Sequence, residues 1–178
     1  MTPLKEATAQ KHKQAERMPF NVRMFKGELT PEAYAGYLVS QKTIFHVLES
    51  TFHLPHQGFK RVEAINKDLK ELNVPIPAPD AATQAYANYL KNLTQDQAEP
   101  HMYLNYLALL FGGQMMKTKI PGSGAMYAFE NIPDLIASVR RIQKDEWADE
   151  VNKGFDYMID IFDELESIYY GEKVEINR

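Results

Sequence analysis

The amino-acid sequence predicts an all-α protein, a single-domain helical bundle. Nearly every segment shows helical spacing of its apolar residues, and neither β-strand alternation nor an internal repeat stands out. The 178 residues match the length of one domain, and a hydrophobic content of 44% is enough for one core. Helices with one apolar face bury it against other helices, so we expect these elements to pack as a bundle.

Four helices are expected in the first half of the chain, and their ends carry start or stop signals. Thr2-Pro3 is an N-cap followed by proline at the first helical position, and Thr30-Pro31 repeats this signal. Met18-Pro19-Phe20 interrupts the first helix. The expected helices are 2–17, a short one ending near residue 27, 31–53 and 59–72.

The second half follows a clear connector, the stretch NVPIPAPD at 73–80, which has three prolines in eight residues. Asp80 caps the next helix, and the sequence Pro-Gly-Ser-Gly at 121–124 stops a later, strongly apolar one. The expected helices are 80–93, 97–119, 133–144 and 145–170. We expect the helical domain to cover 1–171, followed by a polar C-terminal tail at 172–178.

Composition excludes several classes of protein. A net charge of −4 and a pI near 5.7 give no basic footprint for nucleic acid. The longest apolar runs are far shorter than the roughly 20 residues that span a bilayer, and we see neither a signal peptide nor a membrane anchor. We therefore expect a soluble, cytoplasmic protein with no nucleic-acid or membrane partner. The chain has no cysteine, which removes disulfides, iron–sulfur clusters and thiolate ligands or nucleophiles.

Two short stretches carry most of the functional information. The first is LKEATAQKHKQAE at 4–16, in which His12 is the single histidine among helix formers. The second is HMYLNYLALLFGGQMM at 101–116, which places Gly112-Gly113 inside an apolar helical run. Each glycine inside a helix costs roughly 1 kcal/mol relative to alanine, so the pair needs a reason. Close approach of a flat ligand to the backbone is one reason, and a helix kink or a tight helix crossing is the alternative.

These two stretches resemble the heme oxygenase family. The first matches the family's Leu-Lys/Arg-Glu-Ala/Gly-Thr pattern, with the proximal histidine four residues after the threonine. The second matches the start of the distal helix, His-x-Tyr, and the Gly-Gly-Gln that follows. The resemblance extends over nearly the whole chain and implies the all-α heme oxygenase-like fold. The matching positions are Leu4, Lys5, Glu6, Ala7, Thr8, His12, Gln14, Ala15, Glu16, His101, Tyr103, Gly112, Gly113 and Gln114.

His12 is the expected iron ligand. Glu16 lies at i+4 on the same helix face, where its carboxylate can accept the Nδ1 proton and leave Nε2 to face iron. Lys5 lies two turns before His12, and its ammonium can reach a propionate at the porphyrin edge. The resemblance assigns the same roles to these three positions.

The resemblance also implies the other walls of a heme pocket. Gly112 and Gly113 would form the distal wall. Tyr103 and Arg140 would bind the propionates, although loop lengths leave Arg141 open, and Lys144 belongs to the same basic group. For the basic residues, a solvated helix face is the alternative.

The distal helix departs from the animal and bacterial pattern. Those members have arginine in place of Asn105, Gly-Asp in place of Ala108-Leu109, serine in place of Phe111 and often tyrosine in place of Phe45. The plastid-type branch also lacks the aspartate. The resemblance makes Leu109 a catalytic position together with Gly112 and Gly113, and its apolar side chain predicts a distal side poor in fixed water.

A second set of residues offers an alternative chemistry. His46, Glu49 and His53 lie at i, i+3 and i+7, with His56 just beyond, a spacing compatible with a non-heme di-iron site. No matching carboxylate–histidine set follows on later helices, and a mixed polar helix face is the simpler interpretation.

The resemblance implies a heme oxygenase. Heme would be both cofactor and substrate, cleaved to biliverdin, carbon monoxide and iron with O2 and electrons from a ferredoxin, flavodoxin or reductase. A non-catalytic heme-binding protein for storage, transfer or sensing is the main alternative.

Overall fold

The computed structural model describes residues 1–171, and the expected tail at 172–178 lies outside the described residues. Within 1–171 every regular element of secondary structure is a helix, which confirms the all-α class. The α-helices are α1 (Leu4–Ala7), α2 (Ala9–Glu16), α3 (Pro19–Phe25), α4 (Pro31–Thr51), α5 (Val62–Leu72), α6 (Ala81–Lys91), α7 (Gln95–Phe111), α8 (Gly113–Met116), α9 (Ile132–Ile142) and α10 (Ala148–Tyr170). The 3₁₀ turns are η1 (Gln57–Phe59), η2 (Ala125–Tyr127) and η3 (Asp145–Trp147).

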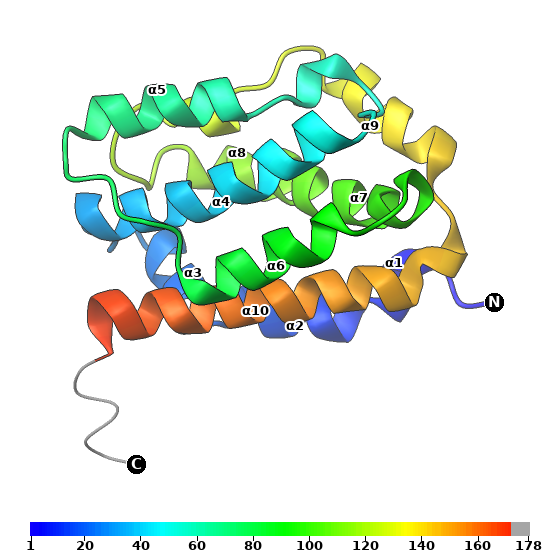
Figure 1. The fold of residues 1–178 in the computed structure, drawn as a ribbon, viewed down its shortest axis with the longest axis horizontal. Coiled ribbons are helices and arrows are strands. Elements are labelled where there is room, and N and C mark those ends of the chain that lie inside the picture. Colours follow the sequence, from blue (N-terminus) through cyan, green and yellow to red (C-terminus); the bar gives the residue numbers. More distant parts are fainter. Residues whose placement is uncertain (172–178) are drawn as a thin grey trace.

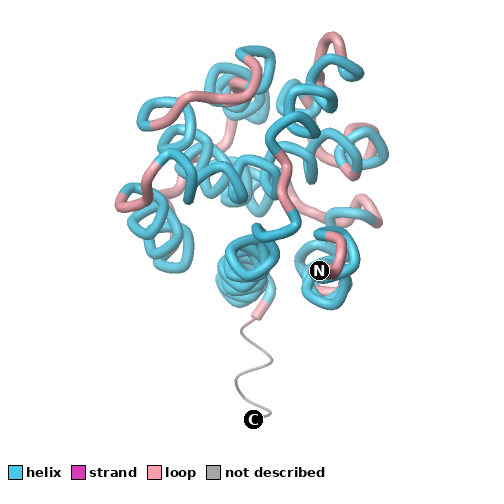
Figure 2. Tube along the Cα trace, turned by 90° about the vertical axis from the view of Figure 1, so that its right-hand side faces the viewer, coloured by secondary structure: helices cyan, strands magenta, loops and turns pink. Residues whose placement is uncertain are grey.

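Two long helices organise the bundle. Helix α4 packs between α5 and α6 and supplies much of the core, with Tyr34, Leu38, Phe45 and Leu48 fully buried. Helix α10 runs along one edge of the molecule in Figure 1 and packs against α2, α3, α6 and α7. In the view turned by 90°, the N-terminal segment lies beside α10 (Figure 2). Helices α2 and α7 therefore share α10 as a common support.

The caps of the later helices follow the expected signals. The hydroxyl of Thr30 accepts from Ala33 N at 3.1 Å, and the carboxylate of Asp80 accepts from Thr83 N at 3.0 Å. Thr94 and Gln97 form a capping box that starts α7 two residues earlier than expected.

Two expected helices are divided in the structure. The helix expected at 2–17 breaks at Thr8, whose hydroxyl donates to Leu4 O at 2.9 Å and competes with the main-chain ladder. The helix expected at 97–119 is divided at Gly112, which is the C-cap of α7 and the N-cap of α8 and keeps a helical backbone conformation. No helix within residues 1–171 is both long and apolar enough to cross a bilayer.

Candidate functional site

Helices α7 and α8 carry an exposed apolar face. Ala108, Phe111, Gly112 and Met115 are exposed and lie at i, i+3, i+4 and i+7, so they form one stripe, here called the apolar stripe. Phe111 is 52% exposed and Met115 is 59% exposed, unusual values for large apolar side chains. The stripe is a surface suited to a flat apolar ligand.

The two glycines have different surroundings. A Cβ at Gly112 would meet only Ala108 O, at 3.2 Å, so this position faces open space on the apolar stripe. A Cβ at Gly113 would lie 2.3 Å from Cδ1 of Tyr127, a ring that packs onto this backbone. We expected both glycines to face a ligand. Gly113 is instead explained by close packing of η2 on α8.

His12 is exposed on α2 and paired with Glu16. The side chain of His12 is 60% exposed, and its Nε2 lies 2.9 Å from Glu16 Oε1. The ring stacks on Phe155 of α10, with centroids 5.6 Å apart and an interplanar angle of 18°. The i+4 pairing is as expected, but the nitrogen is not: Nε2, rather than Nδ1, contacts the carboxylate. Glu16 lies one turn further along the helix, where its carboxylate reaches Nε2, the outer nitrogen of the ring. Because Nε2 is engaged in this contact, the His12 ring must rotate before Nε2 can face a ligand.

Helix α10 brings the two helices of the site together. Leu4, Ala15, Leu104 and Phe155 belong to one buried cluster, which joins α1, α2, α7 and α10. Leu104 lies one turn before Ala108, so α7 is covered up to this point and the apolar stripe begins beyond it.

Of the expected propionate residues, Tyr103 and Arg140 lie close together, and Lys5 lies at the start of α1. Leu4 N donates to Asp145 Oδ1 at 2.9 Å, which holds the start of α1, and hence Lys5, beside η3. Tyr103 packs edge-on against Trp147 of η3, with centroids 6.1 Å apart. Burial raises the pKa of Tyr103, and the positive charge of Arg140 opposes this rise. Arg140 thus lies next to Tyr103. The choice of Arg140 over Arg141 as a propionate ligand stays a prediction.

Leu109 does not lie on the apolar stripe. It is 4% exposed and belongs to the main core, unlike its exposed neighbours on α7. Phe45 is also buried, where it packs on Tyr106 with centroids 4.9 Å apart. The expectation that Leu109 lines the space above a ligand is corrected, because its side chain points into the bundle.

A buried polar network, which the sequence did not reveal, links α7 to α6 and α10. His101 is fully buried, with Nδ1 2.7 Å from the hydroxyl of Tyr86 and Nε2 2.9 Å from Glu150 Oε1. Asn105 Nδ2 donates to the Tyr86 hydroxyl at 3.0 Å. Only the i, i+4 spacing of His101 and Asn105 was visible in the sequence, since their partners lie on other helices.

The comparison with known families decides the identity of the fold. The family model described as heme oxygenase matches residues 1–162 of the 178-residue chain. The chain belongs to the heme oxygenase family. The resemblance found in the two sequence motifs is therefore confirmed.

Curated heme oxygenases are similar at moderate identity. Chloroplastic heme oxygenase 3 of Arabidopsis thaliana is 32% identical over 127 residues, covering 63% of this chain and 45% of that protein. Chloroplastic heme oxygenase 1 of Oryza sativa subsp. japonica is 28% identical over 187 residues, covering 86% of this chain and 65% of that protein. The chain thus spans about half to two thirds of the length of these two relatives.

Solved heme oxygenase structures share the fold. Heme oxygenase-1 of the cyanobacterium Synechocystis in complex with heme superposes with a TM-score of 0.79 at 19% identity, over 98% of this chain and 95% of that one. The heme oxygenase of Leptospira interrogans gives a TM-score of 0.77 at 22% identity, over 90% of this chain and 97% of that one. At these identities the likeness establishes the heme oxygenase fold.

Two residues of the alternative di-iron set, Glu49 and His56, accept hydrogen bonds from the main chain. Glu49 accepts from the main-chain N–H groups of Arg61 and Val62 and thereby caps α5. His56 Nδ1 accepts from Gly58 N at 2.9 Å. Among the described residues, no group of three or more histidine, cysteine or acidic side chains is placed to hold a metal ion. The geometry therefore gives no support to the di-iron alternative.

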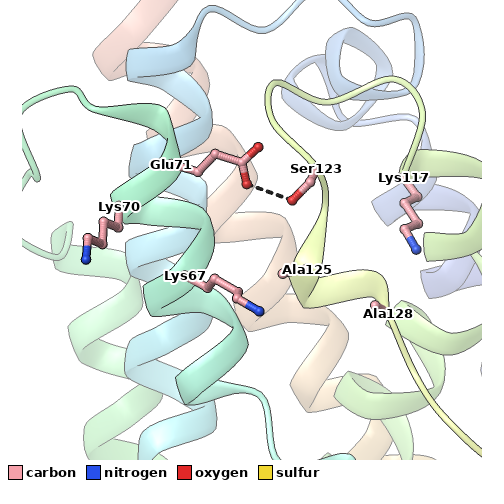
Figure 3. Close-up of a pocket in the computed structure, with 7 residues that line it drawn as sticks. All are labelled: Lys67, Lys70, Glu71, Lys117, Ser123, Ala125 and Ala128. Carbon is pink, nitrogen blue, oxygen red and sulfur yellow. Dashed lines mark hydrogen bonds between the residues drawn. The ribbon is translucent and has the colours of Figure 1, made fainter.

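One cavity lies away from His12 and the apolar stripe. It measures about 500 Å³ and lies between α5, the end of α8 and the segment around η2 (Figure 3). Two of its lining residues are hydrogen-bonded, with Ser123 donating to Glu71 at 2.7 Å. A second cavity of about 320 Å³ lies near His56 and Arg61. Neither cavity is lined by His12 or by a residue of the apolar stripe.

Proposed function

We propose that this heme oxygenase family member binds heme between His12 and the apolar stripe and cleaves it to biliverdin, carbon monoxide and iron. The observation that carries the proposal is the exposed apolar stripe on α7–α8. The exposed His12 lies on α2, and α2 and α7 both pack against α10. Heme would be both cofactor and substrate. O2 would be the oxidant, and a ferredoxin, flavodoxin or reductase would supply electrons.

The residues present fit a heme. A porphyrin face is flat and apolar, and Phe111 and Met115 offer exposed apolar surface whose burial is favourable at about 25 cal/mol per Å². Gly112 carries no side chain and faces open space, which permits close approach to the backbone. When bound, heme iron supplies the site for O2 activation.

The side chains around the ring would each have one task. His12 would hold the iron once its ring has rotated to free Nε2 from Glu16, whose carboxylate would then accept from Nδ1, and Phe155 supports the ring. Lys5, Tyr103 and Arg140 would bind the propionates through charge-assisted and neutral hydrogen bonds. Gly112 would let α7–α8 lie close over the ring, and Gly113 would hold that segment against Tyr127.

A hemin titration with matched variants tests heme binding. Wild-type protein should give a saturable, histidine-ligated Soret band at one hemin per chain. His12→Ala should abolish this band or convert it to a weakly ligated form, and added imidazole should restore it. His46→Ala is the matched control, because His46 is an exposed histidine on another helix and should bind hemin normally. A His12→Ala spectrum identical to that of wild type would disprove the ligand assignment.

A turnover experiment separates the enzyme from a heme-binding protein on the same fold. The hemin complex is reduced under air in the presence of catalase, and the product is identified by absorption and chromatography. Biliverdin supports the oxygenase, whereas an unchanged heme under these conditions supports storage, transfer or sensing. A cytoplasmic location stays a prediction, since the two plant relatives are named chloroplastic proteins.

A further inference from the structure

The cavity between α5 and the segment that follows α8 is lined mainly by positive charge. Three of its seven lining residues are lysines, Lys67, Lys70 and Lys117, and Glu71 is the acidic one. The whole chain has a net charge of −4, so this cluster has the opposite sign to the protein that carries it. Its volume of about 500 Å³ lies within the range of roughly 300–1,000 Å³ that small-molecule sites usually have.

The lysines of this cavity are left without a counter-charge from the protein. Glu71 lies at i+4 from Lys67, a spacing that suits an ion pair, but its carboxylate accepts from the Ser123 hydroxyl at 2.7 Å instead. None of the ion pairs formed within residues 1–171 includes Lys67, Lys70 or Lys117. A concave surface lined by one sign of charge concentrates ions of the opposite sign.

The wall of the cavity that faces α5 is held in place by hydrogen bonds. The buried carboxylate of Asp68 accepts from Ala125 N and from Met126 N, each at 2.8 Å, which fixes η2 on α5. Gly124 has φ +72°, and a Cβ there would lie 3.0 Å from Cγ of Lys117, so the stem of Lys117 packs on this turn. The site is therefore largely built before a ligand arrives, which lowers the cost of ordering it.

Two of the lysines approach the segment around η2 from different elements. In Figure 3, Lys67 reaches from α5 toward Ala125, and Lys117, the C-cap of α8, stands beyond Ala128. The side chain of Lys70 points away from this segment. An ammonium group is a compact charge with three donors that binds phosphate or carboxylate oxygens. Two such groups held apart suit a ligand whose negative charge is divided between two groups.

We propose that this cavity binds a small organic anion with two anionic groups, phosphate or carboxylate, one held by Lys67 and the other by Lys117. Lys70 adds to the positive field at the cavity. Ala125 and Ala128, with their small side chains, leave room for the part of the ligand between its anionic groups. The site shares no residue with His12 or the apolar stripe, so the inference does not depend on the proposed heme function.

Isothermal titration calorimetry on the whole chain without hemin tests the proposal. The probes are sodium pyrophosphate, sodium citrate and inorganic phosphate, all at one ionic strength because salt screens exposed charges. Pyrophosphate or citrate should bind saturably at one per chain, and the tighter of the two identifies the anionic group that the site prefers. Inorganic phosphate, which has a single group, should bind roughly tenfold more weakly.

Substitutions distinguish the cavity from charge in general. Lys67→Ala and Lys117→Ala should each weaken binding of the tighter probe at least about fivefold. Lys91→Ala is the matched control, because it removes an exposed lysine of α6 and changes the net charge equally, and it should bind like wild type. Ala128→Phe leaves the charge unchanged but fills the cavity, so it should prevent binding. Circular dichroism melts check that each variant is folded.

Several results would overturn the inference. They are the absence of saturable binding of both pyrophosphate and citrate to wild type, equal losses in Lys67→Ala and Lys91→Ala, and normal binding in Ala128→Phe, which would place the anion on the outer surface. Inorganic phosphate that binds as tightly as the better of the other two probes would contradict the two-group assignment. Failure of the His12-dependent hemin complex overturns the proposed function alone, since these titrations contain no hemin.

Discussion

Alanine substitutions at Gly112 and Gly113 should have opposite effects on stability, although the two residues are adjacent. At Gly113 the new Cβ would lie 2.3 Å from the ring of Tyr127, which is 2% exposed and cannot easily move. Overpacking of this kind costs about 1–3 kcal/mol, partly offset by about 0.5–1 kcal/mol of helix propensity. At Gly112, with φ −74° and ψ −33°, the backbone is already helical and the Cβ meets only Ala108 O at 3.2 Å.

We therefore expect Gly113→Ala to lose about 1–2 kcal/mol, or roughly 2–8 °C of melting temperature for a chain of this size. Gly112→Ala should melt at or above the wild-type temperature. In hemin titrations we expect Gly112→Ala to be the more impaired of the two variants. Its new methyl group would lie on the apolar stripe and should weaken the affinity for hemin roughly 5–150-fold. Circular dichroism melts and absorbance titrations measure the two effects. Equal melting temperatures for the two variants, or unchanged hemin affinity in Gly112→Ala, would refute the reasoning.

Three further predictions use the same assays. Leu109→Asp should destabilise the protein by several kcal/mol or prevent folding, because Leu109 is 4% exposed in the core, and a well-folded variant in thermal melts would contradict this. The hydrogen bond from His101 lowers the pKa of Glu150 below its ordinary value of about 4.3, so its stabilisation is present above that value and lost as pH falls through the folded pKa. Urea unfolding should show Glu150→Gln less stable than wild type at neutral pH, with the gap closing in acid; a gap that is constant with pH would argue against the assignment. Arg140→Glu should weaken hemin affinity more than Arg141→Glu, and equal titrations would make both a solvated face.

The sequence was sufficient for the fold where local signals decide an element. Thr30 and Asp80 cap their helices as predicted, because a cap depends on residues three positions apart. The break at Thr8 was not predictable in the same way. It accompanies a hydrogen bond from Leu4 N to Asp145, which lies 141 residues later, and such a contact has no local signature.

The candidate site was likewise predictable only where its residues are close together in the sequence. The pairing of His12 with Glu16 followed from their i+4 spacing on one helix. Which nitrogen of His12 faces Glu16 did not follow, since the ring also packs on Phe155 from α10. The network joins Tyr86 on α6, His101 on α7 and Glu150 on α10, and His101 and Glu150 are 49 residues apart in sequence, so it is visible only once the three helices are packed.

The position of Leu109 is a matter of helical phase. Consecutive residues of an α-helix lie about 100° apart, so Leu109 is turned well away from its neighbour Ala108. Asn105 and Leu109 are four residues apart and lie within about 40° of each other, on the same side of α7. Both side chains are buried, with 1% and 4% of their surface exposed, whereas Ala108, Phe111 and Gly112 are exposed. A carboxylate at position 109 would therefore enter the core rather than the apolar stripe, where burying it without a partner is costly. This is why we expect Leu109→Asp to unfold the protein rather than to add a polar group to the apolar stripe.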